Sequence, residues 1–166
     1  LPGPITEPIQ NKENEILAPA TSIDEPKTNV LEIIKPKEDV LTANKRVSIE
    51  TPSITGSINL QGAILDDLTL SNYKVSLDDN SKNIDLLSPD GTSNPYYIEF
   101  GWKVLGDQNA QLPNLETIWK TDSSILSQDN SVRLSWTNDE NITFLKHFSV
   151  DENYMFSVSQ EVINNS

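Results

Sequence analysis

The chain has 166 residues and carries 12 basic against 25 acidic side chains, for a net charge of −13. That length accommodates one domain with a short appendage. The acidic balance argues against a nucleic-acid ligand, which rewards clustered lysine and arginine, and against adsorption on an anionic membrane surface. The chain has no cysteine, which excludes a disulfide scaffold and a cysteine-based zinc site. It also has no run of about 18 apolar residues that could cross a bilayer.

The first 45 residues have the composition of a linker. Six of the ten prolines lie there, interspersed with Glu, Lys, Asn and Thr. Such a segment cannot bury enough apolar surface to offset the entropy lost on ordering. We therefore predict a disordered Pro-rich linker over residues 1–45, whose removal should leave the melting temperature of the domain unchanged. The stretch from Asn29 to Leu41 leaves a second interpretation open, a short segment that docks on a partner or on the domain, although Pro36 should interrupt any helix there.

Apolar and polar side chains alternate between Arg46 and Tyr73. This period of two, carried by β-branched residues, predicts strands packed on one face. The alternating apolar residues are Val47, Ile49, Ile54, Ile58, Leu60, Ile64, Leu68 and Leu70. Gly56 and Gly62 lie where the chain is expected to bulge or turn.

Short predicted strands separated by turn clusters continue to the end of the chain. They cover residues 84–87, 96–104, 117–120, 132–136, 142–150 and 154–162. In the strand over 142–150, Lys146 is a misfit on the face that carries the phenylalanines. Regular strand spacing without an intervening helical pattern predicts an all-β fold, an antiparallel β-sandwich over residues 46–166.

The order and spacing of several short patterns carry a resemblance to a known family. These patterns are Arg46-Val47-x-Ile49-x-Thr51, Gly56-Ser57-Ile58-Asn59, Gly62-Ala63-x-Leu65-Asp66-Asp67-Leu68 and Tyr73, followed more loosely by Pro95-Tyr96-Tyr97 and the run from Trp136 to Phe148. Together they cover roughly residues 46 to 163. The sequence resembles the opening of the periplasmic domain of the YidC membrane protein insertases, part of the YidC/Oxa/Alb family.

The resemblance implies a fold, a location and a role. The fold would be the first part of a β-supersandwich that continues beyond Ser166. The location would be the periplasmic face of the bacterial inner membrane, in an integral membrane protein whose helices lie outside this chain. The role would be a docking or spacing module of an insertase and chaperone for inner-membrane proteins. Its partners would be accessory subunits of the Sec translocon and nascent membrane proteins. Because insertion would be the work of the membrane region, the chain itself is expected not to be an enzyme.

The aromatic residues are the one feature that a binding module could use. Tyr97 falls on the polar side of its predicted strand, and Trp102, Trp119 and Trp136 could converge with it into a cleft. Large aromatics at alternating positions more often belong to a core. Both interpretations stay open here, and with them an alternative function, a carbohydrate-binding β-sandwich module.

Other polar residues give no sign of chemistry. The single histidine, His147, has no second histidine or cysteine to form a metal site with it. Adjacent acidic residues such as Asp66 and Asp67 should point to opposite faces of a strand and be solvated. We therefore predict no metal site, no cofactor and no catalytic residue.

Overall fold

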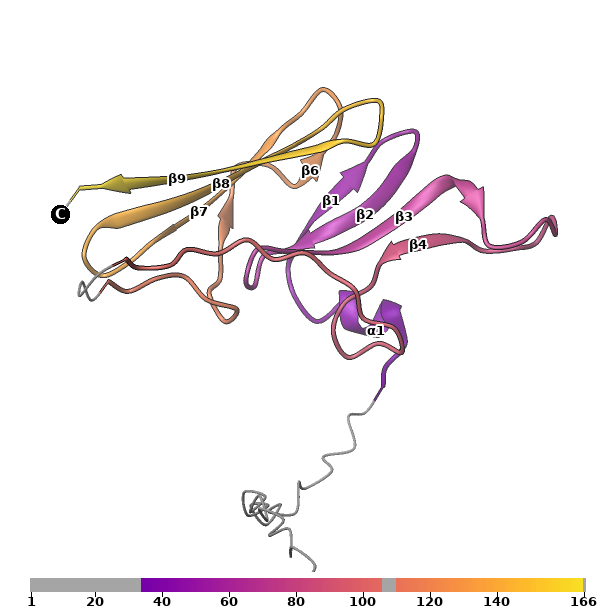
Figure 1. The fold of residues 1–166 in the computed structure, drawn as a ribbon, viewed down its shortest axis with the longest axis horizontal. Helices are drawn as coiled ribbons and strands as arrows, with labels where there is room; N and C mark the ends of the chain where they lie inside the picture. The colour runs from indigo at the N-terminus through magenta and orange to yellow at the C-terminus, as the bar shows by residue number, and fades with distance from the viewer. Residues whose placement is uncertain (1–33, 106–109, 166) are drawn as a thin grey trace, which may run out of the picture. The chain divides into compact units, whose positions relative to one another are not determined.

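The computed structural model describes residues 34–105 and 110–165, and within these ranges strands are the main regular secondary structure, joined by turns and extended segments (Figure 1). The first sheet has the strand order β4-β3-β2-β1-β6 and the second has the order β5-β7-β8-β9. The strands are β1 (Arg46–Glu50), β2 (Ile54–Asn59), β3 (Ile64–Lys74), β4 (Asn83–Leu87), β5 (Lys120–Thr121), β6 (Ile125–Leu126), β7 (Val132–Thr137), β8 (Ile142–Val150) and β9 (Phe156–Asn164).

Both sheets contribute to a common hydrophobic core. Its fully buried members include Val47, Ile49 and Ile58 from the first sheet and Leu134 and Phe148 from the second. These are the side chains that the period-two pattern assigned to one face of each strand. The all-β, antiparallel architecture expected from the sequence is thereby confirmed, with one departure. The two-residue strand β6 pairs with β1 in parallel.

The hairpin of β1 and β2 shows how local sequence forms the first sheet. Arg46 pairs with Asn59 and Glu50 with Thr55, and the Thr51 hydroxyl closes the turn by accepting a hydrogen bond of 2.8 Å from the Ile54 amide. Gly56 lies where β2 approaches β3 so closely that an added Cβ would meet a backbone oxygen at 2.0 Å. Side chains are therefore excluded from this position by backbone proximity.

A bulge between β2 and β3 changes which side chains of β3 are buried. Ser57 pairs with Asp67 and the next residue, Ile58, pairs with Leu65, so Asp66 is the extra residue. A bulge disrupts the strict alternation of faces. Both Asp66 and Asp67 are consequently buried, and the expectation that they would be solvated is wrong.

The segment predicted as a strand over residues 96–104 forms only isolated bridges. Tyr96 bridges Ser88, and Ile98 bridges Leu65 through a reciprocal pair of hydrogen bonds. Beyond Ile98 the antiparallel register would bring the segment opposite Ala63 and Gly62, which have positive φ and lie in the turn before β3, so no ladder continues there. The prediction of a strand over residues 96–104, which was based on this alternation, is therefore wrong.

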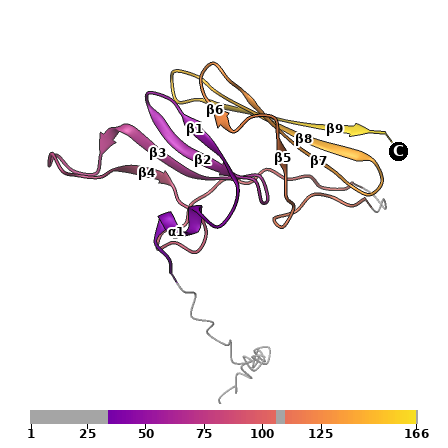
Figure 2. The ribbon, with the colours of Figure 1, turned by 180° about the vertical axis from the view of Figure 1, so that it is seen from behind.

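Two further strands begin later than predicted. The strand expected over 117–120 is the two-residue β5, seen from behind in Figure 2, and Trp119 precedes it with a 2.8 Å hydrogen bond from its amide to the Leu60 carbonyl. The last strand starts at Phe156 because Tyr154, at φ 68°, lies in the preceding turn.

The predicted linker falls mostly outside the described residues. Within residues 34–45, a one-turn helix α1 (Lys37–Leu41) follows directly after Pro36. A proline at the start of a helix costs no intrahelical hydrogen bond, so Pro36 precedes this helix rather than interrupting it. The Lys35 amide donates to the Gly91 carbonyl at 2.9 Å. Residues before Arg46 therefore contact the folded part of the chain.

Candidate functional site

Lys146 is buried on the core face of β8. It lies between Phe144 and Phe148 in the period-two register, and only 1% of the residue is exposed. Lysine is almost never fully buried without a partner, because transfer of its ammonium group from water is costly. The misfit noted in the sequence is thus the centre of an unusual local environment.

Two indole rings surround the ammonium group of Lys146. Trp102 and Trp119 stack with ring centroids 5.9 Å apart and an interplanar angle of 19°. The Lys146 Nζ atom lies 5.6 Å from the Trp102 centroid and 5.0 Å from the Trp119 centroid, within the range of cation–π attraction. The same nitrogen donates long hydrogen bonds to the carbonyls of Gly62 at 3.4 Å and Ala63 at 3.5 Å.

Burial dominates the titration of this lysine. It lowers the pKa of Lys146 to about 8, while the negative charge of Glu99 opposes the shift. The amine is therefore far closer to losing its proton near neutral pH than an exposed lysine would be.

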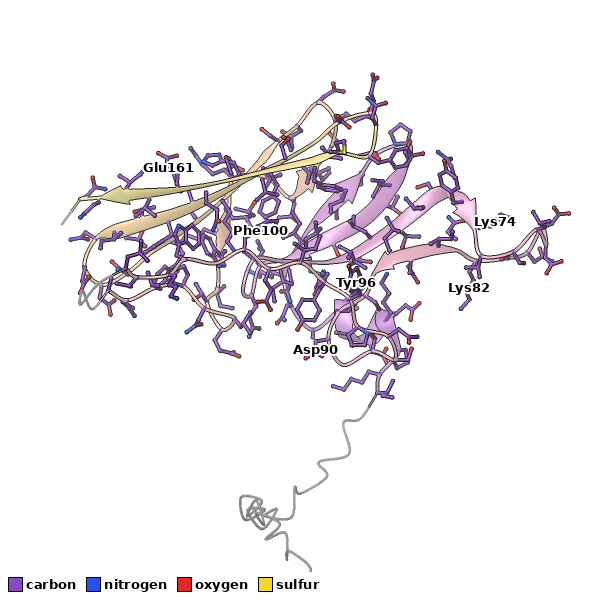
Figure 3. All side chains as sticks on the ribbon, viewed as in Figure 1. Lys74, Lys82, Asp90, Tyr96, Phe100 and Glu161 are labelled. Atoms are coloured by element: carbon purple, nitrogen blue, oxygen red, sulfur yellow. The ribbon has the colours of Figure 1, made fainter. Side chains whose placement is uncertain are left out.

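These groups line a cavity of about 220 Å³, called here the Lys146 cavity. Its wall includes Lys146, Trp102, Trp119, Glu99, Phe100 and Leu115. Phe100, labelled in Figure 3, packs edge-on against the core residue Phe148, with ring centroids 6.3 Å apart. This contact connects the cavity wall to the core. The cavity therefore combines an ammonium group with aromatic and aliphatic surface.

The structure separates the four aromatic residues that the sequence singled out. Trp102 and Trp119 line the Lys146 cavity. The ring centroids of Trp136 and Phe144 are 5.7 Å apart, and those of Phe144 and Trp102 are 5.2 Å apart. Trp136 therefore belongs to the same aromatic cluster without lining the cavity. Tyr97 lines a second cavity, of about 280 Å³, beside Asp66 and Asp90. Lys146 was missed as a site residue, although its position on the phenylalanine face was the available signal.

A second group of charged residues, the Lys37 cluster, joins α1 to the first sheet. Lys37 Nζ lies 2.9 Å from carboxylate oxygens of both Asp67 and Asp85 and donates to the Leu87 carbonyl at 3.1 Å. Burial alone would lower the pKa of Lys37, but the two carboxylates outweigh it and the pKa is raised. The Ser57 hydroxyl donates to the other oxygen of Asp67 at 2.7 Å.

The neighbouring carboxylate, Asp66, is paired with a different cation. Arg46 binds Asp66 through Nη2 and the Ser57 hydroxyl through Nε at 2.7 Å. Burial raises the pKa of Asp66, against the opposing effect of the Arg46 guanidinium. The pairing explains how two adjacent aspartates are tolerated inside the sheet.

Residues 34–105 and 110–165 contain neither a cluster of metal ligands nor a membrane-spanning helix. No group of three or more His, Asp or Glu side chains there could hold a metal ion. No helix in those ranges is long and apolar enough to span a bilayer.

Comparison with known proteins gives one consistent family. The family model described as the YidC periplasmic domain matches residues 46–166. The protein described as "Membrane protein insertase YidC" from Methylorubrum extorquens (strain PA1) is 45% identical over 130 residues, which are 78% of this chain and 21% of that protein. Proteins of the same description from Rickettsia felis and Rickettsia canadensis are 37% and 39% identical over 166 residues, covering 98% of this chain and 30% of each relative.

The resemblance carried by the strand patterns after Arg46 is confirmed by these matches, and so is the expected location at the periplasmic face of the bacterial inner membrane. The chain spans less than a third of the length of these relatives. The chain belongs to the YidC membrane protein insertase family, and its residues 46–166 are periplasmic-domain sequence of that family.

Proposed function

We propose that this chain is the periplasmic docking or spacing module of a membrane protein insertase that inserts and helps fold inner-membrane proteins. The observation that carries the proposal is the family match over residues 46–166, together with relatives whose description names that activity. The domain would work beside membrane-embedded machinery outside this chain and would itself catalyse no reaction. Its partners would be accessory subunits of the Sec translocon and nascent membrane proteins.

The charge of the domain supports a position away from the lipid surface. Residues 46–166 carry 7 basic and 17 acidic side chains, a net charge of −10 obtained by counting over the printed sequence. An anionic lipid surface repels such a module, which favours contacts with protein rather than with headgroups. The Pro-rich residues before α1 would serve as the linker that joins it to the rest of the protein, since α1 itself contacts the first sheet.

The positions of Trp102 and Trp119 give no support to the carbohydrate-binding alternative. A sugar-binding platform needs an indole face that is free to stack on a ring. The faces of Trp102 and Trp119 stack on each other, and Trp119 is only 2% exposed. We therefore do not propose that function.

Domain replacement in the full-length insertase tests the proposal. One version lacks residues 46–166, and a second carries an unrelated acidic β-sandwich of the same length in their place. Insertion of an inner-membrane reporter is followed by protease protection in cells depleted of the native insertase. Slower insertion on deletion, with retained residual activity, is expected. Rescue by the unrelated domain would indicate spacing, and failure of rescue would indicate docking. Complete loss of insertion, equal to loss of the membrane region, would contradict an auxiliary role.

Photo-crosslinking identifies the docking surface. A photoreactive residue is placed at exposed apolar positions, namely Tyr96, Leu77 and Ile118, which are 71%, 105% and 63% exposed. Adducts with translocon accessory subunits at some of these positions are expected. A probe at buried Phe148 is the matched control and should give none.

A further inference from the structure

Within the described part of the chain the Lys146 ammonium has no ion pair, although the negative charge of Glu99 in the same cavity wall acts on it. Among the described residues, no acidic oxygen lies within ion-pair distance of its Nζ atom, and its two hydrogen bonds, at 3.4 and 3.5 Å, are at the long limit. Lys37, by contrast, meets two carboxylates at 2.9 Å. A buried cation without an ionic partner costs several kcal/mol, about the penalty given for one desolvated ion.

A second hydrogen-bond donor in the same wall is also unsatisfied. The indole N–H of Trp119 is buried and has no acceptor among the described residues. Most buried side-chain donors in native proteins have a partner. The cavity wall therefore contains a residue with an unsatisfied donor, Trp119, in addition to the weakly hydrogen-bonded ammonium of Lys146.

Much of the rest of the cavity wall is apolar, and its other polar side chains are Glu99 and Asn114. Phe100, Trp102 and Leu115 supply aromatic and aliphatic surface next to the ammonium group. Glu99 is the one acidic side chain in this wall, and it has no ion pair with Lys146. The cavity thus combines one cationic anchor with a small hydrophobic enclosure, an arrangement that suits an anion carrying a short apolar body.

We propose that the Lys146 cavity is a binding site for a carboxylate carried on a small apolar group. The carboxylate would accept charge-assisted hydrogen bonds from the Lys146 ammonium, and the apolar group would lie against Trp102 and Leu115. The ligand could come from a free monocarboxylic acid or from the terminal carboxylate of a polypeptide, since both present the same chemistry. This site is independent of the docking or spacing role proposed above.

Paired ligands that differ only in charge test the site on the unmutated 166-residue chain. The probes are 3-phenylpropionate and its amide, and the dipeptide N-acetyl-Gly-Phe with a free or amidated terminus. Binding at pH 7 is followed by tryptophan fluorescence, because Trp102 and Trp119 line the cavity. Each carboxylate should bind at least about tenfold more tightly than its amide, the usual range for a charge-assisted hydrogen bond. Equal affinities, or no binding of either carboxylate at millimolar concentration, would overturn the proposal.

Three variants test whether Lys146 is the source of the preference for the carboxylate over the amide. Lys146→Met should remove the preference for the carboxylate, while Lys103→Met, at an exposed lysine of the neighbouring segment, should retain it. Loss of the preference in Lys103→Met alone would overturn the assignment. Binding that appears only after Glu99→Gln would show that the Glu99 carboxylate pairs with the Lys146 ammonium in solution. That result would also overturn the proposal. If Lys146→Met does not fold, the amide comparison on the unmutated chain decides the result.

The two ligand sources give different patterns. Binding of 3-phenylpropionate without the dipeptide identifies a free acid as the ligand. Binding of the dipeptide without the free acid identifies a chain terminus, and binding of both supports the shared chemistry. Each pattern supports the site, provided that the amides bind more weakly.

Discussion

Replacement of Lys37 by methionine should destabilise the domain, although this residue lies in a segment whose composition predicts a linker. The substitution keeps an unbranched side chain of similar length and removes the ammonium group that holds Asp67 and Asp85 together. Asp67 has 11% of its side chain exposed, and would lose its ionic partner while remaining within the sheet. The expectation that removal of residues 1–45 leaves melting unchanged is therefore revised by these contacts.

The magnitude follows from the burial of each partner. Asp85 has 55% of its side chain exposed, so its pair with Lys37 contributes less than about 1 kcal/mol. A fully buried pair would cost about 3–5 kcal/mol when one partner is removed. The Lys37 side chain is 17% exposed and the Ser57 hydroxyl remains bonded to Asp67, so an intermediate loss of about 2 kcal/mol is expected.

Urea unfolding followed by tryptophan fluorescence measures this loss. Lys35→Met is the matched control, because Lys35 is exposed and contacts the domain through its backbone amide. The control should shift the free energy of unfolding by less than about 0.5 kcal/mol. Equal stabilities of the Lys37→Met and Lys35→Met variants would refute the reasoning. A chain that starts at Ile34 should match the full chain, whereas one that starts at Arg46 should lose at least as much as Lys37→Met.

Three further predictions concern the interior. Burial places the pKa of Lys146 at about 8 in the folded chain, below its unfolded value of 10.5. Between these two pH values the unfolded chain therefore binds more protons than the folded chain. Stability should therefore rise by an amount on the order of 3 kcal/mol between pH 8 and 10.5, and Lys146→Met should flatten this profile in pH-dependent urea unfolding. Gly56→Ala should cost about 3 kcal/mol or more, because the new Cβ meets a β3 backbone oxygen at 2.0 Å, whereas Gly101→Ala meets nothing within 4 Å and is the thermal-melting control. Arg46→Met should cost about 3–5 kcal/mol by leaving Asp66 buried and unpaired. A double variant that also carries Asp66→Asn should recover part of that loss, and no recovery would contradict the assignment.

The strands that the sequence located correctly share one property, a local pattern that suffices to define them. In β1 and β7, and in β8 apart from Lys146, alternate side chains are apolar, and a strand places alternate side chains on one face whatever its neighbours are. The buried positions of Val47, Leu134 and Phe148 follow from this periodicity alone. The family resemblance likewise depended only on the order and spacing of residues.

Tertiary structure decided what depends on distant partners. The segment 96–104 alternates as a strand should, yet it finds no continuous edge to pair with, because its antiparallel register with β3 runs into the turn at Gly62 and Ala63. The burial of Asp66 requires the bulge opposite Ser57 and the guanidinium of Arg46. The pKa of Lys146 is lowered by burial, and the side chains around its ammonium, Trp102 and Trp119, come from other segments. Periodicity is a property of neighbours along the chain, whereas strand pairing and desolvation are set by residues that only the fold brings together.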